Sequence, residues 1–404
     1  MNGKGRAVNT VILIEVLVLI AVLVMSVVSS FAQGSSEEET QAVSAEEESE
    51  SETASEEESE SESEEAVSEI YEEERLTFSD EVEEYLSQLS QEQLVAQLFV
   101  TTPEELTGYD QVEVAGDATQ AALEEYPVAG LVYSELNFSG KSQTMNLLSG
   151  TEEYSQEAVG LGLFFIVEES GGENASPLAS SNAYTVVSSP LVLASEADES
   201  ALEEAVSTRA EYLSAEGFNM LLGPVADLAD GSDEDFDELC YGSELNLAAQ
   251  YIETEISIML ESQINCILRS FPGVKTAAED YSVFDSAIEA GVGVIQAGSI
   301  ACAELTGSST EPCTLSAETV RALRDDLGFD GIIMTSDLSD EAVSSLYGIG
   351  EAAVKALQSG MNLIYVTDGF EEAYEAVLTA VESGEITQEM LQNSVGRIIT
   401  LKLS

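Results

Sequence analysis

Residues that can do chemistry follow directly after several short apolar runs of the sequence. Glu168 follows LFFIV, Asp227 follows NMLLGPVA, Arg269 follows INCIL, and Ser336 and Asp337 follow GIIMT. Carboxylates serve as nucleophiles or as general acids and bases, and a guanidinium group holds polar ligands through a rigid fork of donors. These residues are therefore the candidates for a catalytic or ligand-binding site.

The composition narrows the chemistry that is open to these residues. The 404 residues include 12 Lys and Arg, 78 Asp and Glu, and no histidine, which gives a formal net charge of −66. Without histidine the chain can build no Ser-His-Asp or Cys-His nucleophile and no histidine-ligated zinc site. We expect no nucleic-acid partner, because binding phosphates needs clustered Lys and Arg. We also expect no cofactor and no metal, since the acidic loop at residues 227–239 lacks the order of an EF-hand.

The elements that position these residues can be read from eight apolar runs, which alternate with amphipathic stretches. Continuous apolar runs are typical of parallel strands that are buried on both faces. Eight strand-helix units over about 300 residues predict an α/β fold of the (β/α)8 TIM-barrel type, with functional residues just past the carboxyl ends of the strands. A doubly wound open sheet is the alternative, although no glycine fingerprint for phosphate supports it. The runs are 96–102, 128–135, 163–169, 219–227, 264–271, 292–298, 331–337 and 361–368, and the clearest helical segments are 200–217, 245–263, 316–328 and 351–360.

The N-terminal part has the features of a membrane anchor. Lys4 and Arg6 precede an apolar run that is long enough to cross a bilayer. We expect residues 1–7 to be a short cytoplasmic segment and residues 8–31 a transmembrane helix; a long signal peptide cleaved near residues 30–32 is the alternative. Because the basic residues precede the span, the positive-inside rule predicts a single-pass protein of the cell membrane whose barrel is extracytoplasmic.

A Ser/Glu-rich stretch separates this anchor from the barrel. Residues 32–76 contain few apolar side chains, and such a segment cannot bury enough surface to offset the cost of ordering. We therefore expect a disordered acidic linker at residues 32–76 and a single barrel domain at residues 77–404.

The order of motifs in the barrel resembles glycoside hydrolase family 3, in its β-N-acetylhexosaminidase-like and β-glucosidase-like members. LFFIVEESGGENASPL resembles the family's third strand and its Asp-x-Glu-Gly-Gly motif, and GFNMLLGPVADL resembles the fourth strand. ILRSFPGV stands where Lys-His-Phe-Pro-Gly-His-Gly is expected, and LRDDLGFDGIIMTSDLSDEAV resembles the nucleophile-bearing seventh strand. The resemblance runs from about Leu86 to Leu403 and implies a glycosidase-type barrel.

Two catalytic positions depart from the family's motifs. The resemblance implies an aspartate nucleophile where Ser336 stands, with Asp337 one residue later. Because successive residues of a strand point to opposite faces, we expect Asp337 to point away from the site. The histidine proton donor that the resemblance implies after the fifth strand is missing, and Glu279, Asp280 and Asp285 are the candidate replacements.

Three substrate-holding positions keep polar residues. Glu168 stands for a sugar-binding aspartate of the family, Arg269 for a lysine, and Asp227 is retained. Glu168 and Arg269 either contact a sugar or form an ion pair with each other across the barrel mouth. Asp227 either contributes to the site or caps a turn, since aspartate side chains accept hydrogen bonds from loop backbone.

These departures favour a catalytically impaired or inactive family member that binds a glycan, such as a cell-wall fragment, or an unidentified protein partner. The alternative is an active glycosidase that hydrolyses O-glycosyl bonds of β-linked glycans, with Asp337 as nucleophile and an unidentified acid as proton donor. A passive spacer at the cell surface is a third hypothesis.

The cysteines suggest one covalent crosslink. Cys302 and Cys313 flank a short polar loop, and disulfides persist outside the cytoplasm. We therefore expect these two residues to be able to form a disulfide, whereas Cys266 lies within an apolar run and is expected in the core.

Overall fold

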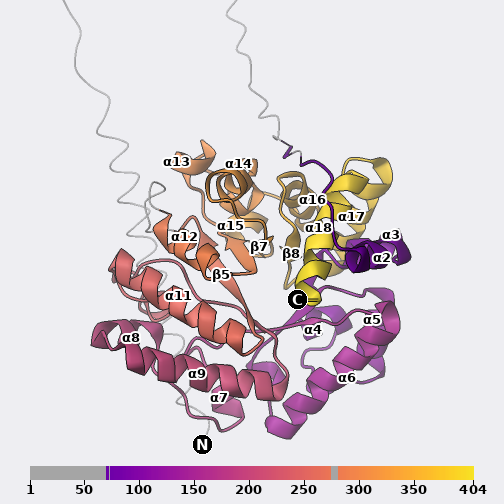
Figure 1. Ribbon diagram of the computed structural model, residues 1–404. Coiled ribbons are helices and arrows are strands. Elements are labelled where there is room, and N and C mark those ends of the chain that lie inside the picture. Colours follow the sequence, from indigo (N-terminus) through magenta and orange to yellow (C-terminus); the bar gives the residue numbers. More distant parts are fainter. Residues whose placement is uncertain (1–69, 72, 274–280) are drawn as a thin grey trace, which may run out of the picture. The chain divides into compact units, whose positions relative to one another are not determined.

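The computed structural model describes residues 70–71, 73–273 and 281–404, which form a closed barrel of eight parallel strands (Figure 1). Each strand pairs with the next, and β8 closes the barrel by pairing with β1. The predicted TIM-type barrel is confirmed and the doubly wound alternative is wrong. Every strand lies inside one of the eight predicted runs: β1 (Phe99–Thr101), β2 (Gly130–Tyr133), β3 (Phe164–Val167), β4 (Met220–Leu221), β5 (Asn265–Phe271), β6 (Val294–Ala297), β7 (Ile332–Asp337) and β8 (Leu363–Tyr365).

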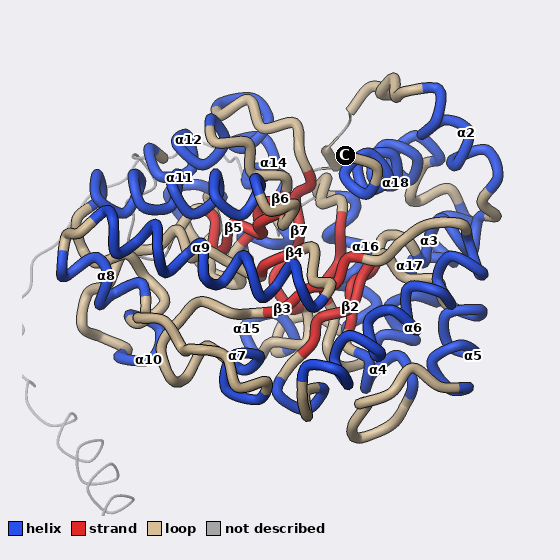
Figure 2. The backbone as a smooth tube through the Cα atoms, turned by 60° about the horizontal axis from the view of Figure 1, so that its bottom comes forward, coloured by secondary structure: helices blue, strands red, loops and turns tan. Residues whose placement is uncertain are grey.

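Helices surround the strands on the outside (Figure 2). They are α2 (Asp80–Gln88), α3 (Gln91–Ala96), α4 (Pro103–Thr107), α5 (Asp117–Glu125), α6 (Lys141–Val159), α7 (Pro177–Ser181), α8 (Pro190–Glu196), α9 (Glu199–Glu216), α10 (Glu234–Asp237), α11 (Leu245–Glu261), α12 (Ser282–Glu289), α13 (Ala303–Thr306), α14 (Ala317–Arg321), α15 (Glu341–Ser344), α16 (Ile349–Gln358), α17 (Phe370–Ser383) and α18 (Gln388–Lys402). Short 3₁₀ turns lie at η1 (Glu135–Asn137) and η2 (Cys313–Leu315), and η3 (Ala322–Asp326) is a π-helical turn.

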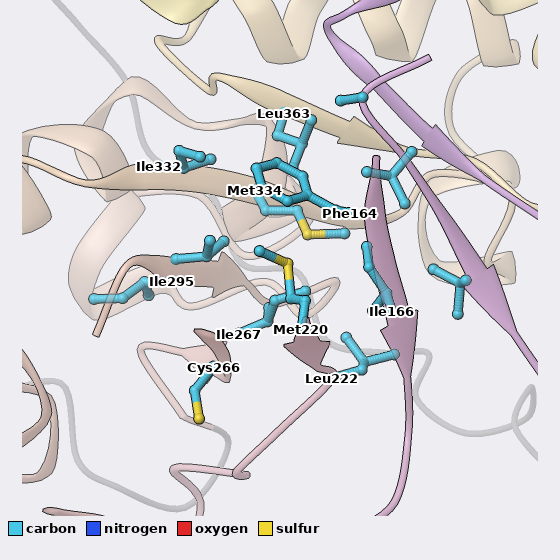
Figure 3. Packing of buried hydrophobic residues seen from close by; sticks show 14 of the residues in the cluster. Phe164, Ile166, Met220, Leu222, Cys266, Ile267, Ile295, Ile332, Met334 and Leu363 are labelled. Carbon is cyan, nitrogen blue, oxygen red and sulfur yellow. The ribbon is translucent and has the colours of Figure 1, made fainter. Parts of the chain in front are cut away.

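The interior of the barrel is filled by side chains at alternate strand positions. Phe164 and Ile166 of β3 and Met334 of β7 meet Met220 and Ile267 there (Figure 3). These side chains are nearly or fully buried. Because one face of each strand supplies this packing, the residues that follow on the same strands are carried to the barrel mouth.

The helices match their predicted segments with one difference. The segments 200–217, 245–263 and 351–360 correspond to α9, α11 and α16. The segment 316–328 instead divides into α14 and the π-helical turn η3, where the Leu327 amide donates to the Ala322 carbonyl, five residues back. Such turns interrupt regular helices at specific sites, and the sequence pattern alone does not reveal them.

The predicted transmembrane segment 8–31 lies outside the described residues. None of the helices in the described part is long and apolar enough to cross a membrane. Tyr71, Glu73 and Leu76, which the prediction placed in the linker, bond to the barrel. The ion pair between Glu73 and Arg397 and the ring of the nearby Phe78 hold this part of the chain against the barrel. Composition alone had assigned residues up to 76 to the linker.

The predicted disulfide between Cys302 and Cys313 is absent, and both side chains are free thiols. An antiparallel bridge pairs Ala301 with Pro312, so the two cysteines are diagonal neighbours rather than directly opposite. Diagonal positions are farther apart than the Cβ atoms of a disulfide. Burial, followed by the nearby Cys302, raises the pKa of the Cys313 thiol to about 11.

Candidate functional site

An ion pair lies at the carboxyl ends of β3 and β5. Arg269 Nη1 donates to Glu168 Oε1 at 2.9 Å. The side chains are 36% exposed for Glu168 and 23% exposed for Arg269, so both remain accessible from solvent. The predicted ion pair is confirmed. It brings an acceptor and a rigid donor together at the mouth, where a polar ligand can compete for either.

A buried carboxylate fixes the strand end that carries Glu168. The side chain of Glu169 accepts hydrogen bonds from the amides of Leu178 and Ala179 and from the Tyr212 hydroxyl. Its backbone carbonyl accepts from Arg209 Nη1 at 2.8 Å. Burial raises the pKa of the Glu169 carboxyl above its usual range, although the hydrogen bonds from Tyr212 and the two amides oppose this shift. These contacts tie the end of β3 to α7 and α9.

Arg209 is itself held by a second buried acid. Arg209 Nη2 donates to Glu255 Oε1 at 2.5 Å, and the Tyr241 hydroxyl donates to Glu255 Oε2 at 2.7 Å. The side chains of Arg209 and Glu255 are 1% and 2% exposed. A charge that is buried this deeply requires its partner, since an unpaired buried ion costs several kcal/mol. The network therefore positions the mouth without contacting a ligand.

Asp337, the candidate nucleophile, is engaged by four donors. Its Oδ1 atom accepts from the Ser339 amide at 3.0 Å, the Ser339 hydroxyl at 2.7 Å and the Thr367 amide at 3.2 Å. Its Oδ2 atom accepts from the Thr367 hydroxyl. The carboxylate thus joins the ends of β7 and β8, and most of its acceptor capacity is used within the protein.

Ser336 stands at the position that the resemblance assigns to the nucleophile. Its amide donates to Thr314 Oγ1 at 3.0 Å. The residue is 7% exposed, and its Oγ has no hydrogen-bond partner among the described residues. A serine without a neighbouring base is a poor nucleophile, so the hydroxyl offers a buried polar contact rather than covalent chemistry.

The alternation argument that predicted the direction of Asp337 does not hold here. Met334 pairs with Leu363, but Asp337 pairs with Tyr365, so β7 contains one residue more than β8 over this stretch. Such a bulge changes the direction of the side chains that follow it. The direction of Asp337 therefore cannot be obtained by counting along the strand, whereas its four donors are defined by the contacts above.

Tyr365 is a site residue that the sequence analysis missed. Burial, followed by Asp337, raises the pKa of its phenol above the usual range, with Glu168 and Asp340 acting in the same direction and Arg269 in the opposite one. The four charged groups therefore lie within electrostatic reach of the Tyr365 phenol at the mouth. Burial and Asp337 also raise the pKa of the Asp340 carboxyl. Tyr365 lies inside the eighth predicted run and Asp340 lies three residues past the seventh, and this position was the signal available in the sequence.

The remaining candidates lie at the edge of this group or outside it. Asp227 is fully buried, and its Oδ1 accepts from the Leu228 amide at 2.9 Å, as expected of a turn-capping aspartate. Asp285 lies in the first turn of α12, whereas Glu279 and Asp280 lie outside the described residues. Within the described part, no group of three or more acidic or cysteine residues could hold a metal ion.

Three cavities of about 790, 710 and 680 Å³ lie elsewhere in the molecule. None of them is lined by Glu168, Arg269, Asp337 or Tyr365. The candidate site is thus the polar mouth itself, which offers a carboxylate, a guanidinium, a phenol and hydroxyl groups. These groups suit hydrogen bonding to a polyhydroxylated ligand.

Comparison with known proteins gives consistent results. The family model described as the glycosyl hydrolase family 3 N terminal domain matches residues 82–281 and 275–401. The β-hexosaminidase LpqI of Mycobacterium tuberculosis is 28% identical over 214 residues, which are 46% of this chain and 54% of that protein. A β-hexosaminidase of Xanthomonas oryzae pv. oryzae is 22% identical over 298 residues, which are 68% of this chain and 86% of that protein. The chain thus spans about half the length of the first relative.

Solved structures show the same barrel. A glycoside hydrolase family 3 β-N-acetylglucosaminidase from Paenibacillus sp. str. FPU-7 matches with a TM-score of 0.71 and 26% identity, covering 78% of this chain and 62% of that chain. Mycobacterium tuberculosis LpqI matches with a TM-score of 0.67 and 23% identity, covering 81% of this chain and 97% of that chain. The second likeness concerns the fold alone.

Proposed function

Because the chain belongs to glycosyl hydrolase family 3, we propose that its barrel binds a β-linked glycan at the mouth and hydrolyses it poorly or not at all. The observation that carries this proposal is the pair formed by Ser336 and Asp337. Ser336, which stands at the position that the resemblance assigns to the nucleophile, carries a hydroxyl group instead of a carboxylate. The carboxylate of the adjacent Asp337 accepts hydrogen bonds from Ser339 and Thr367. Retaining glycosidases need one free carboxylate and one acid on opposite sides of the scissile bond.

Binding of a glycan is supported by the polar groups that remain. Glu168 and Arg269 keep their place at the mouth and are partly exposed. The relatives are named as β-hexosaminidases and β-N-acetylglucosaminidases, so glycans that contain β-linked N-acetylglucosamine are the first ligands to test. We expect a cell-wall fragment of this kind to be the partner.

The test is calorimetric titration of the full chain with chitin and β-glucan oligosaccharides. Glu168→Gln should weaken binding about 10- to 100-fold, because it removes a charged hydrogen-bonding group. Glu203→Gln, an exposed change on α9, is the matched control and should leave affinity unchanged. Absence of binding to every oligosaccharide, or equal affinity of the two variants, contradicts the proposal.

A second candidate function is hydrolysis itself, with Asp337 as nucleophile. It is favoured by the gathering of Asp337, Asp340 and Tyr365 at one mouth, since burial and Asp337 raise the pKa of the Asp340 carboxyl, and a carboxyl with a raised pKa can serve as a proton donor. This function requires that Asp337 retain a free oxygen toward the substrate, and three of its four donors fall on Oδ1.

We also propose that residues 8–31 anchor the chain in the cell membrane and that the barrel is extracytoplasmic. The apolar length of this segment and the basic residues before it support both statements. Fractionation of cells, followed by protease treatment of intact spheroplasts, tests them. Recovery of the full-length chain in the soluble fraction, or full protection of the barrel, contradicts them.

A further inference from the structure

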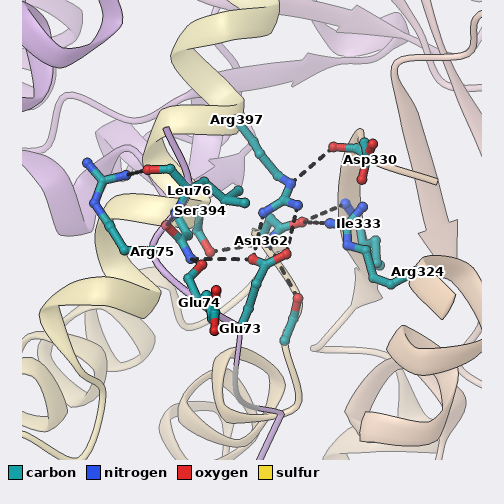
Figure 4. Close-up of polar contacts among 12 residues, drawn as sticks. Glu73, Glu74, Arg75, Leu76, Arg324, Asp330, Ile333, Asn362, Ser394 and Arg397 are labelled. Atoms are coloured by element: carbon teal, nitrogen blue, oxygen red, sulfur yellow. Dashed lines mark hydrogen bonds and ion pairs between the residues drawn. The ribbon is translucent and has the colours of Figure 1, made fainter. Parts of the chain in front are cut away.

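A short segment before the barrel is fixed to its last helix. Tyr71 and residues 73–78, which we call the strap, lie against the end of α16 and along α18. Figure 4 shows Glu73 of the strap beside Arg397 of α18. The Tyr71 amide donates to the Gln358 carbonyl at 2.9 Å, and the Leu76 amide donates to Asn393 Oδ1 at 2.9 Å. The Phe78 ring lies so close to Gly396 that a Cβ atom there would come within 2.2 Å of it. The strap is therefore seated on a surface that is shaped for it.

The central contact of the strap is a two-pronged ion pair. Arg397 Nη1 bonds to Glu73 Oε2 at 2.7 Å, and Arg397 Nη2 bonds to Glu73 Oε1 at 2.9 Å. The Arg397 side chain is only 7% exposed. Asn393 Nδ2 adds a bond to the Glu74 carbonyl at 3.0 Å. Bidentate pairs of this kind are the strongest hydrogen-bonded ion pairs in proteins.

A second guanidinium lies beside the first. Burial, followed by the like charge of Arg397, lowers the pKa of Arg324 to about 10, and Glu73 opposes this shift. Arg324 Nη2 donates to Asn362 Oδ1 at 2.8 Å, and Arg397 Nε donates to the Asp330 carbonyl at 3.1 Å. Glu73 thus pairs directly with Arg397 and also acts electrostatically on Arg324, so its removal would leave the buried charge of Arg397 without its partner.

The strap also immobilises the one basic residue in a long stretch of the chain. No Lys or Arg occurs between Arg6 and Arg75, and the next after Arg75 is Lys141. Arg75 Nη2 bonds to Glu83 Oε2 at 3.1 Å, and Arg75 Nε donates to Gln392 Oε1 at 3.2 Å. A protease that cleaves after basic residues needs a free side chain and a detached, extended backbone, so this arrangement hides the Arg75–Leu76 bond.

We infer that Arg397 and Asn393 form a binding site for an acidic peptide segment, which the chain's own strap occupies through Glu73. Occupancy protects the Arg75–Leu76 peptide bond. When the strap detaches, a protease specific for basic residues adds one water across this bond and separates the barrel from everything before residue 76. The strap is thus a latch that governs release of the barrel from its N-terminal segment.

Limited trypsin digestion of the folded full-length chain tests this inference, with the fragment that begins at Leu76 followed by mass spectrometry. Glu73→Gln should speed cleavage after Arg75 about 10- to 100-fold, because cleavage tracks the population of the open strap. Glu81→Gln removes the same charge from an exposed position nearby and should cleave like the wild type.

Hydrogen exchange supplies a second readout that is independent of the protease. The Leu76 amide should lose protection in Glu73→Gln, while amides of β3 keep theirs, which also shows that the barrel is folded. Equal cleavage rates for Glu73→Gln and Glu81→Gln overturn the inference. Immediate cleavage after Arg75 in the wild type overturns it as well.

Discussion

Thr367 donates both its backbone amide and its hydroxyl to the carboxylate of Asp337, so the segment after β8 fixes the acid that ends β7. Ser339 supplies two further donors. Donors of this number occupy most of the lone pairs of a carboxylate and weaken it as a nucleophile. Asp337 is thus explained as a structural crosslink between two strand ends, next to Ser336, the position that the resemblance assigns to the nucleophile.

Replacing Asp337 should therefore affect stability. We expect Asp337→Asn to lower the free energy of unfolding by about 1–3 kcal/mol, because it leaves donors of Ser339 and Thr367 with a poorer acceptor. Urea denaturation measures this change. Ser339→Ala, which removes one of the four donors, should cost less. Wild-type stability of Asp337→Asn would show that the crosslink contributes nothing.

The buried pair of Arg209 and Glu255 should be more sensitive to single changes than to a double one. Arg209→Met leaves the Glu255 charge unpaired and should cost about 3–5 kcal/mol. Adding Glu255→Leu to this variant should recover a large part of the loss, since two apolar residues can replace a buried pair. Tyr241→Phe removes only one hydrogen bond and should cost about 1 kcal/mol. If the loss of unfolding free energy in the double variant equals the sum of the losses in the two single variants, Arg209 and Glu255 do not pair directly.

Stability should depend on pH through Glu169. Its folded pKa lies above the unfolded value of 4.5, because burial outweighs its hydrogen bonds. The folded protein therefore binds this proton more tightly than the unfolded chain does. Proton binding thus stabilises the folded state at low pH, and this stabilisation is lost as the pH rises from about 4.5 through the folded pKa.

The measurement is the difference in unfolding free energy between the wild type and Glu169→Gln from about pH 4 to about pH 7. Only the wild type carries the titrating group, so its stability relative to the variant should decline over this range. Parallel pH profiles would mean that Glu169 does not titrate with a raised pKa.

Placing a carboxylate at residue 336, to which the resemblance assigns the nucleophile, should give partial activity. Ser336→Asp is expected to cleave dinitrophenyl β-glycosides, whose leaving group needs no protonation, and to leave natural oligosaccharides intact. Release of dinitrophenolate measures this directly. Ser336→Asn, which has a similar volume but no charge, is the control, and equal rates for the two variants would refute the assignment of this position.

Much of the barrel follows from the sequence. The eight apolar runs contain the eight strands because buried parallel strands read as continuous apolar segments. The ion pair of Glu168 and Arg269 could also be predicted, because the carboxyl ends of β3 and β5 meet at one mouth of the barrel. In each case local pattern and topology were sufficient.

Other features depend on contacts that no local pattern encodes. The bulge in β7 arises from its pairing with β8, so face alternation gave an unreliable direction for Asp337. The bond between Arg209 and Glu255 joins residues 46 positions apart on two helices. The local sequence around Glu73 is as rich in glutamate as the acidic stretch before it. Only the pairing of Glu73 with Arg397 distinguishes it from those glutamates.

The central claim is that the barrel retains a glycan site and has lost efficient hydrolysis. Its most direct test is turnover of an aryl β-N-acetylglucosaminide by the full-length wild-type protein, measured beside Asp337→Asn, with folding of both verified by circular dichroism. We predict that neither protein releases the aryl group faster than buffer does. Turnover by the wild type that disappears in folded Asp337→Asn would contradict the claim and identify Asp337 as the nucleophile.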